Sequence, residues 1–206
     1  MMPTSPLAPL RRMALAALLV LVTVAACAAL DDTPTAAVHQ ALDKASAIAA
    51  GGTSADARLD ALRGVARDFI DTRAMGRRAL GPAFAKATPA QQEQFLALFT
   101  ELFIRSYLQK LLLFRAPTFR YGKQEQHGET VRVITQIVAG ADSYEVAYEM
   151  QQVEGRWLAT DIVVEGISMT SNYSDQFASL LRTRSLDELL DLMRRKLGQP
   201  GTPAAH

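Results

Sequence analysis

The side chains best suited to catalysis lie in one segment, DIVVEGISMTSNYSDQF, which runs from Asp161 to Phe177. It begins like a buried strand and passes through Gly166 into a run of hydroxyl and amide side chains. Asp161 and Glu165 would share one strand, where paired carboxylates could act as general acid and base. A serine nucleophile would require a positioned base. The competing interpretation is structural, with charges at a strand edge and hydroxyls that satisfy backbone groups between a strand and a helix.

The rest of the sequence adds no motif that would complete a catalytic, metal or nucleotide site. It contains no G-x-S-x-G elbow, no G-x-G-x-x-G or Walker loop and no H-E-x-x-H. His39, His127 and His206 are the three histidines, and none has a second ligand at metal spacing. We expect all three at the surface. We therefore predict no catalytic residue, no metal ion and no cofactor.

Length and charge exclude some classes of protein. The 206 residues fit one domain together with processing signals, and 49% of them are apolar, enough for a real core. The formal charge of +1 becomes −1 without the first 26 residues, because losing Arg11 and Arg12 leaves 20 basic against 21 acidic residues. A nucleic-acid-binding protein would need a basic stripe to neutralise phosphates, so we expect no nucleic-acid partner.

Residues 1–26 have the pattern of an export signal. Arg11 and Arg12 precede the apolar run from Met13 to Ala26, which is too short for an ordinary membrane span of about twenty residues. A short buried core helix is the alternative. No second long apolar run follows, so we expect the mature protein not to span a membrane. Residues 27–34 would then be a linker, and residues 199–206 a loose tail.

Cys27 leaves two possible ways in which the export signal is cleaved. The sequence VAAC, from Val24 to Cys27, resembles a bacterial lipobox, in which the cysteine is acylated and becomes the first mature residue. The alternative is ordinary cleavage near Ala26 or Ala28 without a lipid. Because Cys27 is the only cysteine, the mature fold has no intramolecular disulfide and no thiolate metal site.

The spacing of apolar residues and the capping signals predict about six helices. Thr88 with Gln91, and Ser185 with Glu188, have the pattern of capping boxes. We expect the first helix at 35–50, the second from Thr53 or Ser54 through Phe69, and the third from Asp71 or Thr72 to Gly81. The fourth should run from Thr88 to about Phe114. The fifth should begin near Ser174, with Ser174 or Asn172 as its cap, and the sixth should run from Ser185 to about Leu197.

Four segments between the fourth and fifth of these helices alternate with period two: TFRYGK, TVRVITQIV, SYEVAYEM and RWLATDIVVE. Gly128, Gly140 and Gly155 lie in the short turns between them, and Gly166 lets the chain turn after the last strand. The segments predict a four-stranded antiparallel meander. With the helices, they indicate a single α+β domain over residues 35–198.

The helix after Thr88 is apolar on more than one side. Phe95, Phe99, Phe103 and Tyr107 lie on it together with several leucines, and further aromatic residues lie on the strands. Such a helix is buried on several sides, so something besides the one sheet must cover it. A plain core would explain this pattern. A cavity with apolar walls, the usual kind of small-molecule pocket, would explain it too.

Two segments resemble one protein family. The first, from Phe69 to Leu111, contains ALG at Ala79–Gly81, TPAQQEQF at Thr88–Phe95, and the pair Phe103 and Tyr107. The second is DIVVEGISMTSNYSDQF, a strand ending in VEG followed by S-x-x-x-N-Y and QF. Together they resemble the MlaC and toluene-tolerance auxiliary family of periplasmic phospholipid-binding proteins, over most of the mature chain.

The resemblance implies a soluble periplasmic carrier with phospholipid acyl chains buried between sheet and helices. Its partners would be an inner-membrane ABC-type lipid transporter and an outer-membrane lipoprotein complex. One branch of the family is associated with hopanoid biosynthesis, so a related amphiphile is an alternative cargo. An enzyme acting on a lipid and a protein-interaction module are the competing functions. We predict that eight residues line the lipid cavity: Phe99, Phe103, Tyr107, Val133, Tyr144, Val146, Tyr148 and Val164.

Overall fold

The computed structural model describes residues 33–113 and 118–198. The predicted export signal, Cys27 and the tail at 199–206 lie outside the described residues, as do almost all of the predicted linker and the residue Phe114. No described helix is both long and apolar enough to cross a membrane.

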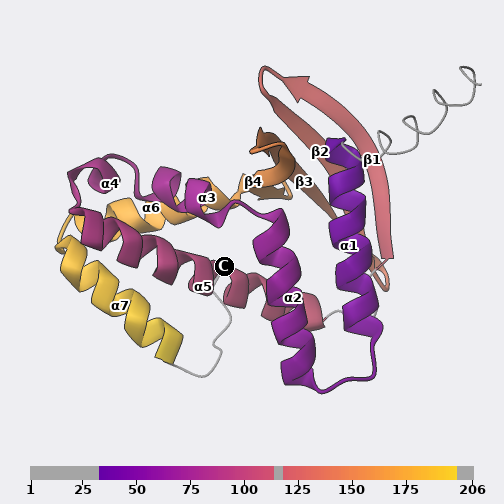
Figure 1. The fold of residues 1–206 in the computed structure, drawn as a ribbon, viewed down its shortest axis with the longest axis horizontal. Coiled ribbons are helices and arrows are strands. Elements are labelled where there is room, and N and C mark those ends of the chain that lie inside the picture. Colours follow the sequence, from indigo (N-terminus) through magenta and orange to yellow (C-terminus); the bar gives the residue numbers. More distant parts are fainter. Residues whose placement is uncertain (1–32, 114–117, 199–206) are drawn as a thin grey trace, which may run out of the picture. The chain divides into compact units, whose positions relative to one another are not determined.

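The described residues form seven helices and one five-stranded sheet, which confirms the predicted α+β class (Figure 1). The helices are α1 Pro34–Ala50, α2 Ala55–Phe69, α3 Thr72–Leu80, α4 Pro82–Lys86, α5 Pro89–Leu113, α6 Met169–Leu181 and α7 Leu186–Gly198. The strands are β1 Thr118–His127, β2 Thr130–Ala139, β3 Asp142–Val153, β4 Arg156–Val164 and β5 Ile167–Ser168.

The sheet is an antiparallel meander in the order β1-β2-β3-β4-β5. The predicted four strands are confirmed, and their turns contain Gly128, Gly140 and Gly155 at φ of 61°, 66° and 76°. Gly166, at φ 78°, turns the chain as expected, but it leads into the two-residue strand β5. The strand count is therefore one higher than predicted.

Two helix predictions need correction. The short helix α4 was missed, because Gly81 and Pro82 were interpreted only as a stop signal. Gly81, at φ 57°, does end α3, but Pro82 then occupies the first turn of α4, where its missing N–H costs nothing. The predicted start of α6 near Ser174 is wrong, since the helix begins at Met169 and Ser168 is its N-cap.

The capping predictions for α5 and α7 are confirmed. The Gln91 N–H donates to Thr88 Oγ1 at 3.3 Å, and the Thr88 N–H donates back to Gln91 Oε1 at 3.0 Å. The N–H of Glu188 donates to Ser185 Oγ at 3.3 Å, and the Ser185 N–H donates to Glu188 Oε2 at 2.7 Å. Both pairs satisfy backbone donors that a helix start leaves unbonded.

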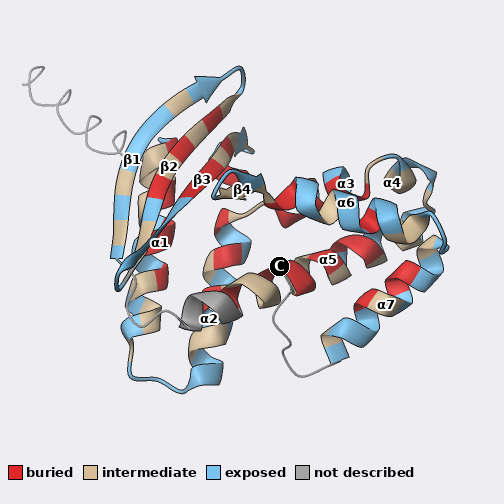
Figure 2. Cartoon of the chain, turned by 180° about the vertical axis from the view of Figure 1, so that it is seen from behind, coloured by how far each residue is buried: buried red, intermediate tan, exposed pale blue. Residues whose placement is uncertain are grey.

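The apolar side chains bury into two clusters. The first, here called the sheet core, lies between the inner face of the sheet and helices α1 and α2 (Figure 2). Along β2, the buried residues Val131, Val133 and Thr135 alternate with partly exposed ones. The second, here called the helix core, is built around α5 with α2, α3, α6 and α7. Ile70, Ile162 and Val164 pack against both clusters, so they form the seam where the two cores meet.

Helix α5 is buried on several sides, as predicted, but its covering elements are mainly other helices. Its principal contacts are with α2, α3 and α7. Phe95, Phe99 and Phe103 are at most 1% exposed. The sheet instead packs against α1, and β4 adds contacts with α2, α3 and α6.

Candidate functional site

A row of aromatic rings runs along α5 and is completed by α6. Residues four apart on a helix lie on one face, so the α5 rings follow one another at centroid distances of 5.9, 5.9 and 4.7 Å. Rings from α6 stack edge-on against them at 5.2 and 5.4 Å. We call this set the aromatic column: Phe95, Phe99, Phe103, Tyr107, Tyr173 and Phe177.

The column ends in polar contacts close to the strand–helix junction. The Tyr107 hydroxyl donates to the sulfur of Met169, at the start of α6. Burial, and to a smaller extent the nearby Tyr173 and then Asp161, raises the pKa of Tyr107 well above its ordinary value. Burial also raises the pKa of Tyr173, against a smaller opposing effect from Ser106. Both phenols therefore stay protonated at neutral pH, so their hydroxyls can donate hydrogen bonds but do not act as bases.

An apolar pocket opens on the side of the column, between α5, α6 and α7. Its volume is about 100 Å³. Most of the lining is apolar, with Ser106, Gln176 and Lys196 as the polar exceptions. We call it the helical pocket, and its walls are Phe99, Leu102, Ser106, Tyr173, Gln176, Phe177, Leu180, Leu189, Leu192, Met193 and Lys196. Apolar walls with a few polar groups are the usual composition of small-molecule pockets, which span roughly 300–1,000 Å³.

The eight residues predicted to line a lipid cavity separate into two groups. Phe99, Phe103 and Tyr107 belong to the helix core and the aromatic column. Of these, Phe99 also lines the helical pocket. Val164 is half-buried and packs against both cores.

The other four predicted residues lie on the inner face of the sheet. Val133, Val146 and Tyr148 are buried in the sheet core. Tyr148 packs edge-on against Phe69 at 5.5 Å, and burial raises its pKa. Tyr144 is 37% exposed, so it stands at the margin of the same face. Of the eight predicted residues, three thus lie in the helix core and three in the sheet core. Val164 lies between the two cores, and Tyr144 lies at the margin of the sheet.

Helix α1 is held over the inner face of the sheet by polar contacts as well as apolar ones. The Tyr121 hydroxyl donates to Asp43 at 2.9 Å, and its ring stacks on His39 at 3.3 Å between centroids. Burial, with the Asp43 hydrogen bond, raises the pKa of Tyr121 to about 12. His39 is therefore partly exposed, with its ring packed against Tyr121.

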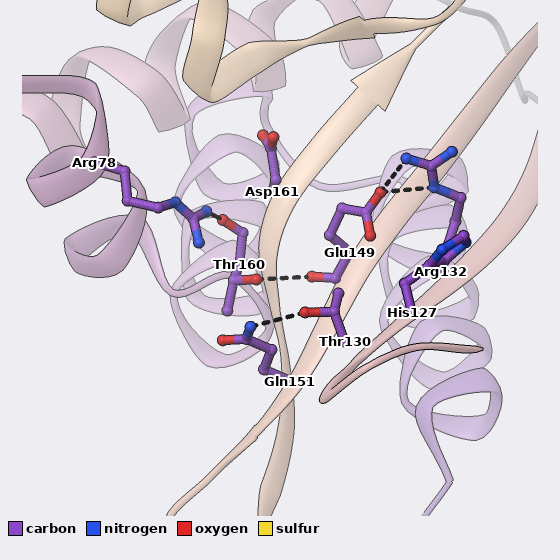
Figure 3. A pocket seen from close by; sticks show the side chains of 8 residues that line it. All are labelled: Arg78, His127, Thr130, Arg132, Glu149, Gln151, Thr160 and Asp161. Carbon is purple, nitrogen blue, oxygen red and sulfur yellow. Dashed lines mark hydrogen bonds and ion pairs between the residues drawn. The ribbon is translucent and has the colours of Figure 1, made fainter. Parts of the chain in front are cut away.

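A second recess, of about 400 Å³, lies on the outer face of the sheet and is entirely polar (Figure 3). Arg78 reaches from α3 and donates to the carbonyl of Thr160. Arg132 forms an ion pair with Glu149 at 2.6 Å. The recess is lined by Arg78, His127, Thr130, Arg132, Glu149, Gln151, Thr160 and Asp161. Two arginines face two carboxylates, so formal charges balance, and no lining side chain is apolar enough to shelter an acyl chain.

The carboxylates that raised the catalytic hypothesis have separate structural partners. Asp161 accepts hydrogen bonds from the hydroxyls of Ser168 and Thr170 and from the Thr170 N–H. Glu165 accepts one from the Glu145 N–H. The Ser168 hydroxyl also accepts the Ser171 N–H at 3.0 Å, which confirms that hydroxyls at this junction satisfy backbone groups. Among residues 33–113 and 118–198, no three His, Cys, Asp or Glu side chains form a group that could hold a metal ion.

Of the eleven residues that line the helical pocket, the sequence predicted only Phe99. Tyr173 and Phe177 were not among the predicted lining residues, although their spacing of four is that of one helical face. The misplaced start of α6 explains this, because a helix starting near Ser174 leaves Tyr173 in a loop. Lys196 was missed because its neighbours, Arg194 and Arg195, make it look like part of an exposed basic run.

Comparisons with known proteins agree with this fold. A family model described as MlaC protein matches residues 35–195. The intermembrane phospholipid transport system binding protein MlaC of Haemophilus influenzae is 22% identical over 181 residues, covering 82% of this chain and 85% of that protein. A phospholipid-binding protein from Ralstonia solanacearum, solved in complex with a phospholipid, matches with a TM-score of 0.73 and 22% identity, covering 81% of this chain and 97% of the other. Because the family model spans most of the sequence, this chain belongs to the MlaC family.

Proposed function

We propose that this protein is an exported carrier that buries the acyl chains of a phospholipid and moves the lipid between membranes. The observation that carries the proposal is the aromatic column, which the helical pocket connects to the protein surface. Two comparisons support it. The Haemophilus relative is named as a phospholipid transport binding protein, and the Ralstonia protein was solved with a phospholipid.

The apolar lining has a direct energetic purpose in such a carrier. Each methylene group removed from water contributes about 0.8 kcal/mol, so a carrier must enclose most of each acyl chain. The helical pocket, at about 100 Å³, has room for roughly four or five methylene groups, since a cavity of about 150 Å³ takes a benzene molecule. A whole phospholipid therefore requires α6 and α7 to move apart from α5 and widen the pocket along the aromatic column.

The cellular setting of this proposal follows from residues 1–26 and from the family. The signal directs the chain to the periplasm, where an inner-membrane ABC-type transporter and an outer-membrane lipoprotein complex would supply and receive the lipid. Cys27 allows either a lipid-tethered or an untethered carrier. The intact mass of the purified mature protein separates these forms, because acylation adds the mass of the attached chains to a protein that begins at Cys27.

A vesicle transfer assay tests the function. Donor vesicles carry a fluorescent phospholipid with a quencher, and acceptor vesicles carry neither. The expected result is a transfer rate that rises in proportion to the concentration of the purified protein. A rate equal to spontaneous exchange at every protein concentration would contradict the carrier function. Extraction of the lipid that copurifies then identifies the cargo as a phospholipid or, in the alternative, a hopanoid or related amphiphile.

A further inference from the structure

Lys196 is the one charged residue among the eleven that line the helical pocket. It lies in the last turn of α7 and is exposed to solvent. A lysine in such a position lays its four-carbon stem along apolar surface and keeps its ammonium group in water. The stem thus extends the apolar wall, and the ammonium group of Lys196 stands at the rim of the pocket.

No carboxylate in the described part of the chain neutralises that charge. On α7, Asp187 accepts a hydrogen bond from Gln91, Glu188 caps its own helix, and Asp191 forms an ion pair with Arg194. On α5, the two acidic residues Glu93 and Glu101 form ion pairs with arginines of α3 and α2.

Two other groups could have interacted with the Lys196 ammonium, a carboxylate on α6 and a backbone carbonyl on α7. Asp175, on α6, is not part of the pocket lining. The carbonyl of Leu197, next to Lys196, already accepts a hydrogen bond from Arg105. The rim therefore offers an ammonium group to whatever occupies the pocket.

We propose that the helical pocket prefers phospholipids whose headgroup carries a net negative charge over zwitterionic phospholipids, and that Lys196 provides this preference. The inference rests on the proposed carrier function. An acyl chain that enters between α5, α6 and α7 leaves its headgroup at the rim, within reach of the Lys196 ammonium. A zwitterionic headgroup presents a cation of its own there, and gains less from the same contact.

A competition experiment tests the preference. The purified protein is incubated with vesicles that hold equal amounts of phosphatidylglycerol and phosphatidylethanolamine with identical acyl chains. The protein is then reisolated and its bound lipids are quantified by mass spectrometry. An ion pair at the rim of a pocket contributes about as much as an exposed salt bridge, so the expected enrichment of phosphatidylglycerol is roughly two- to fivefold. At about 1 M salt, where charges are screened within about 3 Å, the enrichment falls towards one.

Two variants isolate the role of Lys196. Lys196→Met keeps the apolar stem and removes the charge, so it should bind both lipids in the proportions of the vesicles. Arg195→Met is the matched control, because it removes the same charge from the same helical turn at an exposed residue outside the pocket lining. It should keep the enrichment of the unmodified protein.

The possible results distinguish a failure of the proposed headgroup preference from a failure of the proposed carrier function. Lipid bound without enrichment in the unmodified protein would overturn the preference and leave the carrier function intact. Enrichment that persists in Lys196→Met, or that falls equally in Arg195→Met, would overturn the role of Lys196. A protein that binds neither lipid in any preparation would overturn the carrier function itself.

Discussion

Thr170, in the first turn of α6, donates both its hydroxyl and its backbone N–H to the carboxylate of Asp161 in β4, at 2.8 and 3.1 Å. This contact joins the last long strand of the sheet to the helix that carries Tyr173 and Phe177. It therefore positions the α6 half of the aromatic column. A carboxylate that looked catalytic in the sequence holds in place a helix that lines the helical pocket.

Replacing Asp161 with alanine should destabilise the fold. The variant leaves the hydroxyl and N–H of Thr170, which is 7% exposed, without their acceptor, and a buried unsatisfied donor costs about 1–3 kcal/mol. Urea unfolding followed by circular dichroism measures the change. Asp175→Ala is the control, at an exposed position on α6, and it should change the free energy of unfolding by no more than about 0.5 kcal/mol. Equal effects of the two substitutions would contradict the role assigned to Asp161.

Two glycines should respond in opposite directions to substitution by alanine. A Cβ on Gly76 would lie 3.0 Å from the side chains of both Leu96 and Phe99, so Gly76→Ala crowds α3 against α5 and should cost about 1–3 kcal/mol. Gly64, inside α2, has nothing within 4 Å of such a Cβ, and Gly64→Ala should stabilise the fold by about 0.5–1 kcal/mol. Thermal and urea unfolding of both variants check the signs. A stabilised Gly76→Ala would show that α3 and α5 do not pack this closely.

Most of the fold could be predicted from local signals. The turn glycines and the alternating segments define the meander, and the capping boxes at Thr88 and Ser185 define the starts of α5 and α7. These features depend on residues close together in the chain. The start of α6 does not, because it depends on Asp161, nine residues before Thr170 and across the β4–β5 turn. Residue types alone made this stretch look like a loop.

The candidate site was less predictable than the fold. Phe99, Phe103 and Tyr107 were all predicted as lining residues, and in α5 they follow one another at the four-residue spacing of one helical face. Which face of the sheet they would meet could not be predicted. In the structure α5 packs mainly on helices, while Val133 and Tyr148 lie in the separate sheet core. That separation depends on where α1 and α2 are placed, which is a property of the tertiary structure.

The capping box of α7 should make stability depend on pH. Hydrogen bonds from the N–H and hydroxyl of Ser185 lower the pKa of Glu188 below its ordinary value of 4.5. A lowered carboxylate pKa means that the stabilisation is present above pH 4.5 and is lost as the pH falls through the folded-state pKa. The gap in urea midpoint between the unmodified protein and Glu188→Ala should therefore shrink below pH 4.5. A gap that stays constant from pH 7 to pH 3 would show that the charge of Glu188 contributes nothing to the cap.

Filling the helical pocket should block lipid binding. Leu192 lines the pocket and is half-buried, so Leu192→Trp places an indole ring in a space of about 100 Å³. Bound phospholipid per protein, measured after extraction, should fall severalfold. Leu186→Trp is the matched control, since Leu186 is half-buried on the same helix but outside the lining. Unchanged lipid content in Leu192→Trp, with normal content in the control, would place the acyl chains elsewhere, with the sheet core as the next candidate.

Native mass spectrometry of the purified protein shows whether this chain encloses a lipid. We expect a species heavier than the bare chain by the mass of a phospholipid or related amphiphile, which is released when the protein is unfolded. The released molecule should be identifiable in the extract by its fragmentation. A protein that carries no lipid in any preparation, and takes up none from vesicles, would rule out the proposed carrier function.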